Sequence, residues 1–251
     1  MKIAVIGDAC TDKYIYGSCD RLCPEGPVAV MKSKHEISAY GMSANVYNNL
    51  INMRNDIVHH YSNDKYQMEK IRFVDEKSNQ LLLRVDINDT CNRIGIEQLE
   101  EIKNQKYSAI IVSDYCKGYL QDEDIIELGL SSTVSFLDSK RKLTRDMVGA
   151  FNLIKLNEYE YKVNKELADR YKKKFVVTLG SKGVMFLGKV YSPPKILQTY
   201  DVSGAGDTFL AAIVSELMYG QDMDNAIKFA QRCCNKVIQE RGTCVYKGDD
   251  E

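Results

Sequence analysis

Tryptophan is absent from this sequence, and proline and histidine are scarce, with four and three residues respectively. Neither sign of charge is in excess, because the formal net charge at pH 7 is −1. A surface without a positive excess does not attract polyanions, so we expect no nucleic acid partner. The sequence also lacks a long apolar run and an apolar leader, so we expect a cytoplasmic protein that does not bind membranes.

The eight cysteines follow no regular spacing, so they do not predict a disulfide framework. A zinc site at Cys19 and Cys23 is the alternative that their spacing raises. No second pair of cysteine or histidine residues follows at a suitable distance to complete four ligands. We therefore expect the cysteines to be reduced and no zinc to be bound.

Short apolar segments alternate with amphipathic segments along most of the chain. The predicted strands are Lys2–Ile6, Ala109–Ser113, Val134–Asp138, Asn152–Leu156 and Phe175–Leu179. The predicted helices are Ser43–Met53, Gly95–Asn104, Asp122–Leu128, Glu158–Ala168, Ala205–Met218 and Asp222–Gln239. Uniformly apolar strands separated by helices indicate an α/β fold, with a mainly parallel sheet flanked by helices.

Two stretches, Pro27–Lys32 and Lys70–Asp86, depart from this alternation and have the pattern of antiparallel strands with one exposed face. We expect a small sheet, with strands drawn from about 12–40 and 70–86, that projects from the α/β body. The whole chain, 1–251, is then one domain. Its last residues, 247–251, are polar and are expected to be a disordered tail.

The stretch "DVSGAGDTFLAAI", residues 201–213, places two glycines and two aspartates before an apolar helical run. A glycine-rich turn at a helix N-terminus exposes backbone N–H groups and binds anions. An aspartate there repels a phosphate, but it can take the proton of a hydroxyl that attacks the phosphate. The alternative is an ordinary helix cap formed by Ser203 or Asp207. This stretch alone supports both interpretations.

Further motifs occur in a fixed order along nearly the whole chain. They are "VIGDACTDKYIYGSCDRLCPEGPVAV", "GMSANVYNNL", "SNQLLLRVD", "SDYCKGYL", "LNEYE", "VVTLGSKGV", "DVSGAGDTF" and "RGTCVY". With these motifs the chain resembles the ribokinase/PfkB family of carbohydrate kinases. Within that family it is most similar to the kinase half of the bifunctional heptose 7-phosphate kinase/heptose 1-phosphate adenylyltransferases. The resemblance implies a ribokinase-like fold with a projecting lid sheet.

The resemblance also implies roles for the glycine-rich stretch. Asp207 matches the catalytic base of the family, and Gly204, Ala205 and Gly206 match its anion hole. Asp201 opens a loop that in several relatives helps to hold a monovalent cation, so K⁺ is a weaker implication.

On the nucleotide side, Asn157 and Glu160 match the motif that organises Mg²⁺ and phosphate through water. Mg²⁺ keeps several of its waters, so it needs few ligands from the protein. Asn157 can at the same time cap the helix that follows it. Thr178, Gly180 and Gly183 match the loop that receives the phosphates and ribose of ATP.

On the acceptor side, Asp12 and Asn45 match residues that bind sugar hydroxyls, and Gly41 precedes the helix that carries Asn45. Carboxylate and amide groups provide the donors and acceptors that a polyol requires. Arg21 and Lys117 have the motif context expected for contacts with a phosphate on the sugar. Three further cations are candidates for the same contact: Lys70, Arg72 and Arg84.

The sequence departs from the family at two points. Met42 stands where a second glycine is usual, so the acceptor sugar can differ. The segment 55–69 is shorter than in relatives, which predicts a trimmed edge of the sheet. His59 and His60 in this segment are expected to be exposed loop residues rather than catalytic groups.

We therefore expect a kinase that transfers the γ-phosphoryl group of ATP to D-glycero-D-manno-heptose 7-phosphate at the anomeric hydroxyl. One alternative is a kinase for another sugar or sugar phosphate. Another is a nucleotide- or sugar-binding relative without turnover, although a base inside an anion hole argues against it. The projecting sheet either pairs with a second copy, as in relatives, to form a homodimer, or closes over the sugar as a lid.

Overall fold

The computed structural model describes residues 1–64, 67–194 and 199–248 of the chain. The strands of its larger sheet are β1 Lys2–Gly7, β4 Ile57–Tyr61, β7 Ala109–Asp114, β8 Ser135–Ser139, β9 Leu153–Asn157, β10 Phe175–Thr178, β11 Val184–Phe186 and β12 Lys189–Tyr191. Their order across the sheet is β12-β11-β10-β9-β8-β7-β1-β4. From β10 to the edge strand β4 in this order, each strand runs parallel to the next. At the other end of the sheet, β11 pairs antiparallel with both β10 and β12. The predicted mainly parallel sheet is confirmed.

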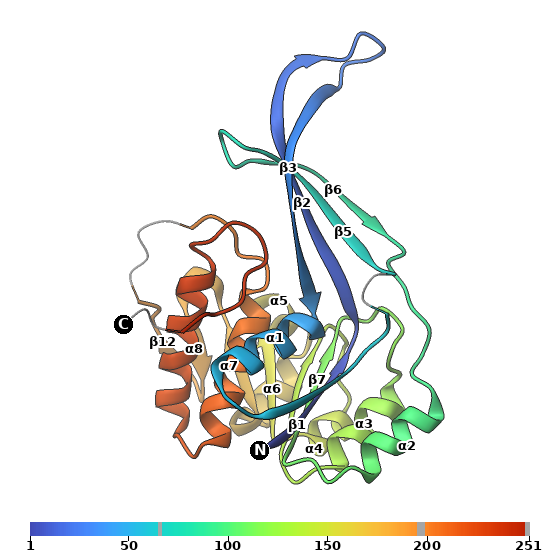
Figure 1. The fold of residues 1–251 in the computed structure, drawn as a ribbon. Helices are drawn as coiled ribbons and strands as arrows, with labels where there is room; N and C mark the ends of the chain where they lie inside the picture. The colour runs from blue at the N-terminus through green and yellow to red at the C-terminus, as the bar shows by residue number, and fades with distance from the viewer. Residues whose placement is uncertain (65–66, 195–198, 249–251) are drawn as a thin grey trace.

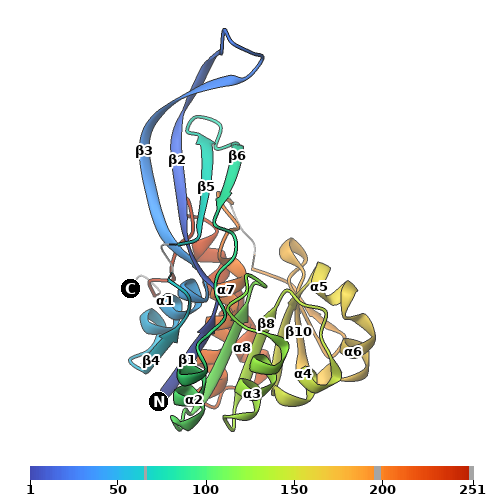
Figure 2. The ribbon, with the colours of Figure 1, turned by 90° about the vertical axis from the view of Figure 1, so that its right-hand side faces the viewer.

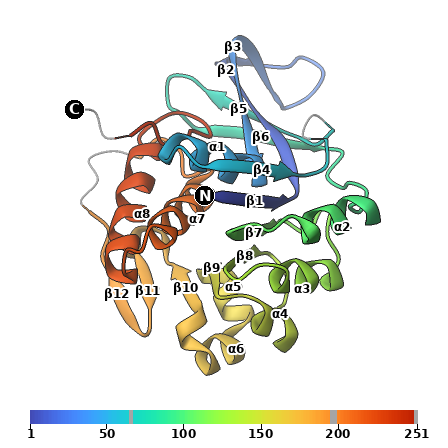
Figure 3. The same cartoon turned by 60° about the horizontal axis from the view of Figure 1, so that its bottom comes forward.

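Helices cover both faces of this sheet, as Figure 3 shows. They are α1 Ser43–Met53, α2 Ile96–Asn104, α3 Asp122–Leu130, α4 Arg145–Ala150, α5 Glu158–Val163, α6 Lys165–Arg170, α7 Ala205–Met218 and α8 Met223–Val237. Two short 3₁₀ segments are Lys172–Lys174 and Gly180–Lys182. The core on one face is shared by α1, α7 and α8, and the core on the other face includes residues of α2, α3 and α4.

The alternation of side chains along the central strands produces the two cores. In β1, Ile3 and Val5 join the core under α7, whereas Ala4 and Ile6 join the core under α3. A strand that is buried on both faces has no polar face to display, so it appears in the sequence as a continuous apolar run. This is why the five predicted strands agree with the structure to within one or two residues.

The smaller sheet is the projecting sheet, formed by β2 Ala9–Leu22, β3 Ala29–Met42, β5 Glu69–Asp75 and β6 Leu81–Ile87 in the order β3-β2-β5-β6. It rises from one end of the body, as Figure 1 shows, and β2 and β3 extend beyond β5 and β6 (Figure 2). The predicted lid sheet is present. However, β2 and β3 have 14 residues each, so the predicted strand Pro27–Lys32 is only part of β3.

The segment after α1 differs from the prediction. It forms the edge strand β4, which pairs with β1, and both of its histidines are half-buried. His60 Nε2 lies 2.9 Å from Ser43 Oγ, and His59 Nδ1 lies 3.1 Å from the hydroxyl of Tyr107. The loop interpretation of His59 and His60 is therefore wrong, because pairing with β1 orders a segment whose own sequence is largely polar.

A second correction concerns the predicted helix Glu158–Ala168, which is divided into α5 and α6 at Asn164. Asn164 is buried, and its Oδ1 accepts a hydrogen bond of 2.7 Å from the amide of Leu143. The side chain of Asn164 therefore holds the preceding loop, and the helix is interrupted at this residue.

The structure also bears on what the sequence suggested about cysteines, metal sites, membrane helices and the C-terminal tail. All eight cysteines are free. Among the described residues there is no group of three His, Cys, Asp or Glu residues that could hold a metal ion. The same residues include no helix with the length and apolar character needed to cross a membrane. Of the expected tail, residues 249–251 lie outside the described part of the chain.

We expect Gly7→Ala to destabilise the protein strongly. A Cβ atom at Gly7 would lie 1.8 Å from the carbonyl oxygen of Ser113 on the neighbouring strand β7. Neither backbone can withdraw inside a buried sheet, so we expect a loss of about 3 kcal/mol or more in the free energy of unfolding. The measurement is chemical or thermal unfolding followed by circular dichroism.

The matched control is Gly149→Ala. No atom lies within 4 Å of a Cβ added there, and Gly149 belongs to α4, where alanine favours the helix. We expect its unfolding midpoint to equal or exceed that of the wild type. A Gly7→Ala protein as stable as this control contradicts the close approach of β1 and β7.

Candidate active site

Asp207 lies in the first turn of α7 with only 3% of its surface exposed. The helix begins after Gly204, whose φ of 79° lies in the left-handed region that favours glycine. The residues Gly204, Ala205 and Gly206 form the glycine-rich turn, and its N–H groups lie at the positive end of the α7 dipole. The N-cap residue is Gly204, which has no side chain to cap the helix. The turn therefore offers backbone donors next to a carboxylate.

Two hydrogen bonds from distant segments hold the Asp207 carboxylate. The hydroxyl of Tyr115, which follows β7, donates to Oδ1 over 2.7 Å. Asn45 Nδ2, from α1, lies 3.2 Å from Oδ2 and also donates to the carbonyl oxygen of Gly204 over 3.4 Å. The amide oxygen of Asn45 accepts a bond of 3.0 Å from Asn49. The carboxylate thus serves neither as a helix cap nor as a free surface group, and the ordinary-cap interpretation is wrong for Asp207.

Burial raises the pKa of Asp207 from its ordinary value to about 6, and the negative charge of Asp138 adds to the rise. The hydrogen bond from Tyr115, the positive charge of Lys155 and the bond from Asn45 lower the pKa and limit the rise. Burial also raises the pKa of the Tyr115 hydroxyl well above its usual range, so this hydroxyl keeps its proton and donates it. A carboxylate with a pKa near 6 is ionised at neutral pH and can still accept a proton.

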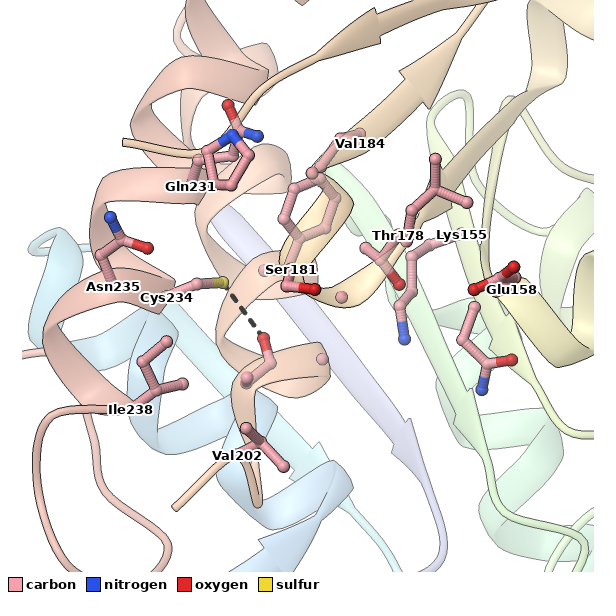
Figure 4. A pocket seen from close by; sticks show the side chains of 18 of the residues that line it. Lys155, Glu158, Thr178, Ser181, Val184, Val202, Gln231, Cys234, Asn235 and Ile238 are labelled. Atoms are coloured by element: carbon pink, nitrogen blue, oxygen red, sulfur yellow. Dashed lines mark hydrogen bonds between the residues drawn. The ribbon is translucent and has the colours of Figure 1, made fainter. Parts of the chain in front are cut away.

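A cavity of about 830 Å³ lies beside the glycine-rich turn, within the size range of small-molecule sites. In Figure 4, Asn235 of α8 and Ile238, the residue after that helix, lie on one side of the cavity, and Lys155 and Thr178 lie on the other. The thiol of Cys234 donates to the carbonyl oxygen of Ala205 over 3.2 Å, the dashed line in Figure 4. Of the predicted nucleotide residues, Asn157, Thr178, Gly180 and Gly183 line this cavity, together with Ala205 and Gly206, whereas Glu160 does not.

Gly183 is required by the loop geometry at the cavity wall. Its φ is 99°, and a Cβ atom there would lie 2.0 Å from the carbonyl oxygen of Tyr191. Gly180 has a φ of 59°, but nothing lies within 4 Å of an added Cβ. The two glycines therefore let the backbone after β10 turn close to the cavity.

Two buried or half-buried lysines stand next to the turn. Lys155, on β9, forms an ion pair of 2.7 Å with Asp138, and both side chains are almost completely buried. A Cβ atom at Gly206 would lie 3.0 Å from Lys155 Nζ, so this ammonium group touches the turn. Lys140 Nζ lies 2.5 Å from Glu160. Both lysines line the large cavity, where they provide positive charge for an anionic ligand.

Asn157 and Glu160 form a capping box at the start of α5. Asn157 Oδ1 accepts from the amide of Glu160 over 2.8 Å, and Glu160 Oε2 accepts from the amide of Asn157 over 2.7 Å. Glu160 Oε1 accepts from Asn157 Nδ2 and from Lys140. Both carboxylate oxygens are thus already bonded. An amide and a carboxylate in this state fit a Mg²⁺ ion that keeps its own waters rather than one bound directly.

On β2, Asp12 is held in a buried ion pair. Its Oδ1 lies 2.5 Å from Arg72, and its Oδ2 accepts a bond of 3.3 Å from the hydroxyl of Thr243. A Cβ atom at Gly41 would lie 2.1 Å from Asp12 Oδ2, so only glycine permits this approach. Met42, the next residue, has a φ of 59°, in the region that favours glycine. The backbone conformation suited to a glycine pair is therefore kept despite the methionine.

The structure does not bring Arg21 and Lys117 together. Arg21 is exposed near the far end of β2, nine residues beyond Asp12, which is roughly 30 Å along the strand. Lys117 is partly buried, its ammonium group is paired with Asp89, and its amide donates to Asp8 over 3.3 Å. Neither cation is free beside Asp207 in this arrangement.

Asp201 does not fit the monovalent cation that the resemblance implied. Its Oδ1 accepts a hydrogen bond of 2.8 Å from the amide of Ser203. It lines a second cavity, of about 240 Å³, together with Arg72 and Arg241. A cation in that cavity would face two guanidinium groups, which repel it.

Three residues at the site were not predicted: Tyr115, Lys140 and Lys155. A lysine inside the apolar strand "LIKLN" was a usable signal, because a buried lysine in a parallel strand needs a partner or a ligand. Tyr115 lies in the quoted motif "SDYCKGYL", but nothing local indicates that its hydroxyl meets a carboxylate 92 residues away.

Solved structures with a similar fold include a ribokinase of Arabidopsis thaliana complexed with ribose and ATP. The TM-score is 0.69 at 17% identity, over 96% of this chain and 93% of that chain. Phosphofructokinase-2 from Escherichia coli in complex with potassium gives a TM-score of 0.74 at 13% identity, over 98% of this chain and 95% of that chain. Likeness at such identities concerns the fold alone. The predicted ribokinase-like fold is confirmed.

Residues 97–247 match the family model described as pfkB family carbohydrate kinase, which is more than half of the chain. The chain therefore belongs to the pfkB family of carbohydrate kinases.

Among its relatives, the bifunctional protein HldE of Aliarcobacter butzleri is 30% identical over 301 aligned positions, which cover 99% of this chain and 63% of that protein. HldE of Campylobacter jejuni subsp. doylei is 26% identical over 295 positions, with coverages of 99% and 63%. The chain thus spans less than two thirds of the length of these relatives. Because 301 positions exceed its 251 residues, the first relative also has residues within the matched region that this chain lacks.

We expect Tyr115→Phe to raise the pKa of Asp207 above its present value of about 6. The variant loses a hydrogen bond that favours the ionised carboxylate, and we expect a rise of about one pH unit. The carboxyl resonance of Asp207, assigned with Asp207→Asn and followed by carbon-13 NMR, measures this pKa without any substrate.

Tyr119→Phe is the control for this measurement, because the Tyr119 hydroxyl donates to Gln98 over 2.9 Å and not to Asp207. We expect it to leave the Asp207 pKa unchanged. Equal titration curves for the two variants contradict the assigned role of the Tyr115 hydroxyl.

Proposed function

We propose that this kinase transfers the γ-phosphoryl group of ATP to a hydroxyl of a sugar phosphate, with D-glycero-D-manno-heptose 7-phosphate as the first candidate acceptor. The observation that carries the proposal is the buried carboxylate of Asp207 beside the glycine-rich turn at the N-terminus of α7. The similarity to HldE proteins supports the choice of acceptor. In this proposal residues 1–251 form one kinase unit, and the strands within 12–40 and 70–86 serve as its lid.

In the proposed reaction, the acceptor hydroxyl gives its proton to Asp207 as its oxygen forms a bond with the γ-phosphorus. The bond between the γ-phosphorus and the β–γ bridging oxygen breaks, and ADP leaves with the electron pair. Tyr115 and Asn45 keep the carboxylate ionised and oriented for this transfer. The base is therefore prepared before the substrates arrive.

The negative charge of the transferring group needs donors at the same point. The N–H groups of Gly204, Ala205 and Gly206 and the ammonium group of Lys155 are the donors proposed for this task; the Ala205 amide also donates to the carbonyl oxygen of Val202 over 3.2 Å. Donors held by the fold do not have to reorganise during the reaction, which is why a fixed turn is effective. Thr178, Gly180 and Gly183 would line the path of the nucleotide phosphates.

Mg²⁺ would be held through water by Asn157 and Glu160, and it would neutralise charge on the ATP phosphates. The capping box holds the buried Glu160 carboxylate against Asn157, which lines the cavity. The proposal does not include K⁺, because Arg72 and Arg241 line the cavity beside Asp201.

On the acceptor side, Asp12, Asn45 and the backbone at Gly41 are the groups proposed to bind sugar hydroxyls. Arg72 orients Asp12 through their ion pair. Met42 fills the position next to Gly41 with a flexible side chain, which favours the second candidate, a kinase for a different sugar or sugar phosphate.

We expect Asp207→Asn to lower kcat about a thousandfold or more, because asparagine keeps the shape but accepts no proton. The measurement is Mg²⁺-dependent ADP release from ATP with sugars and sugar phosphates, and phosphorus NMR locates the new phosphate. Asp222→Asn is the control, since Asp222 caps α8 through the amide of Asn225, and asparagine caps equally well.

Turnover with heptose 7-phosphate that is lost only in Asp207→Asn supports the proposal. Turnover with another acceptor supports the proposed mechanism but shows that the acceptor is a different sugar or sugar phosphate. Binding of ATP or sugar without turnover by the wild-type protein favours the non-catalytic alternative.

We also propose that the projecting sheet pairs with a second copy of the chain. The face of the sheet opposite Asp12 carries Ile71 and Phe73 on β5, paired with Val85 and Leu83 on β6. Leu83 is 56% exposed and Val85 is 36% exposed, so this face presents apolar surface to solvent.

Leu83→Asp is expected to convert a dimer into a monomer, because a carboxylate cannot be buried in an apolar interface without a partner. Light scattering after size exclusion measures the mass. Leu130→Asp is the control, since Leu130 is 69% exposed at the end of α3 and far from the projecting sheet in sequence. A wild-type protein that is monomeric at all concentrations contradicts the pairing.

A further inference from the structure

Lys70 is a buried cation that forms no close ion pair with the described residues. It lies on β5 with 9% of its surface exposed. Among the residues that the structure describes, its ammonium group forms no ion pair within 4.0 Å and no side-chain hydrogen bond. Its Nζ lies 5.3 Å from the ring centroid of Tyr115. The hydrogen bond from Arg84 lowers the pKa of Asp86, the direct partner of Lys70 on β6, and the charge of Lys70 helps to lower it. An ammonium group removed from water normally requires an anionic partner.

The other cations around the projecting sheet are already engaged or lie elsewhere. Arg72 pairs with Asp12, and Arg84 forms two bonds of 2.7 Å with Asp86. Lys117 pairs with Asp89, and Arg21 is exposed at the far end of β2, as described above. Of the five cations that the sequence indicated for a phosphate contact, only Lys70 is both buried and unpaired.

The position of Lys70 connects it to the acceptor side of the site. In the register of β2 and β5, Lys70 is the direct partner of Asp12, so the two side chains leave the same face of the sheet. The ring that Lys70 covers belongs to Tyr115, whose hydroxyl bonds Asp207 and whose side chain lines the large cavity. A ligand between Asp12 and Asp207 would therefore pass close to Lys70.

We propose that Lys70 binds an anionic group of the acceptor, and that this kinase therefore selects a phosphorylated sugar over the same sugar without its phosphate. This inference rests on the proposed function and adds to it the residue that determines acceptor class. Asp12 and Asn45 would bind the sugar hydroxyls. The positive charge of Lys70 would pair with the anionic group of the acceptor, whereas a neutral sugar would leave that charge without this partner. Asp12 and Asp86 beside Lys70 are already paired with arginines, so a bound anionic group would offset more of the cost of burying Lys70.

The experiment compares Lys70→Met with the wild-type protein on two ligands, D-glycero-D-manno-heptose 7-phosphate and the same heptose without phosphate. Dissociation constants come from isothermal titration calorimetry, and kcat and KM come from ADP release. We expect Lys70→Met to weaken binding of the phosphorylated heptose about tenfold or more, and to raise its KM similarly. Binding of the neutral heptose and the KM for ATP should stay within about twofold.

Two variants and one stability measurement separate this role from a structural one. Lys70→Arg keeps the charge and should retain part of the preference for the phosphorylated sugar. Lys13→Met is the matched control, since Lys13 lies on the opposite face of the same sheet and pairs with Glu69. Loss of an unpaired buried charge should leave the melting temperature of Lys70→Met equal to or above that of the wild type.

The outcomes distinguish this inference from the proposed function. If the wild-type protein turns over and Lys70→Met keeps its preference for the phosphorylated heptose, the assignment of Lys70 is wrong and the kinase reaction stands. If no acceptor is turned over, and Lys70→Met loses the binding preference while Lys13→Met keeps it, the role of Lys70 is supported and the proposed kinase reaction is not. A lower melting temperature with equal weakening for both ligands assigns Lys70 a structural role and overturns the inference.

Discussion

The site depends on the two hydrogen bonds that hold the Asp207 carboxylate, one from Tyr115 and one from Asn45. Each donor comes from a different layer: Tyr115 follows a central strand, and Asn45 belongs to α1 on the face shared with α7. Because the carboxylate is buried, its charge is costly unless both donors are in place. The packing of α1 against α7 and the position of the loop after β7 therefore decide whether Asp207 is ionised and oriented.

Beyond Asp207, a cluster of opposite charges follows the carboxyl ends of β8 and β9. Lys155 pairs with Asp138, and Lys140 pairs with Glu160. One oxygen of Asp138, Oδ1, accepts no hydrogen bond among the described residues, although Lys140 Nζ lies 3.9 Å from it. Buried ion pairs of this kind contribute little to stability when they are compared with apolar residues. Their value lies in fixed charge beside a cavity of nucleotide size, where a phosphate would replace part of the missing solvation.

The projecting sheet joins the acceptor side to the C-terminal part of the chain. The hydroxyls of Tyr14 and Thr243 lie 3.0 Å apart, and Thr243 also donates to Asp12. The buried face of β2 therefore carries both the packing that holds the sheet on the body and the carboxylate proposed to bind sugar. A sheet held at one end in this way leaves its far half exposed, as Figure 1 shows, and the apolar face of that sheet is where a second copy is proposed to bind.

The sequence by itself determined the alternation of apolar strands and amphipathic helices and the glycine-rich turn before α7, because these features follow from local periodicity and backbone freedom. Five strands of the main sheet and α1 and α7 were accordingly predicted almost to the residue. The strand β4 and the full lengths of β2 and β3 were missed, since their polar residues gain order only by pairing with distant strands. Only the tertiary structure decided that Tyr115 meets Asp207 and that Lys70 remains unpaired. Those facts depend on which strand ends lie side by side and on how much water the packing removes, and no local pattern encodes either quantity.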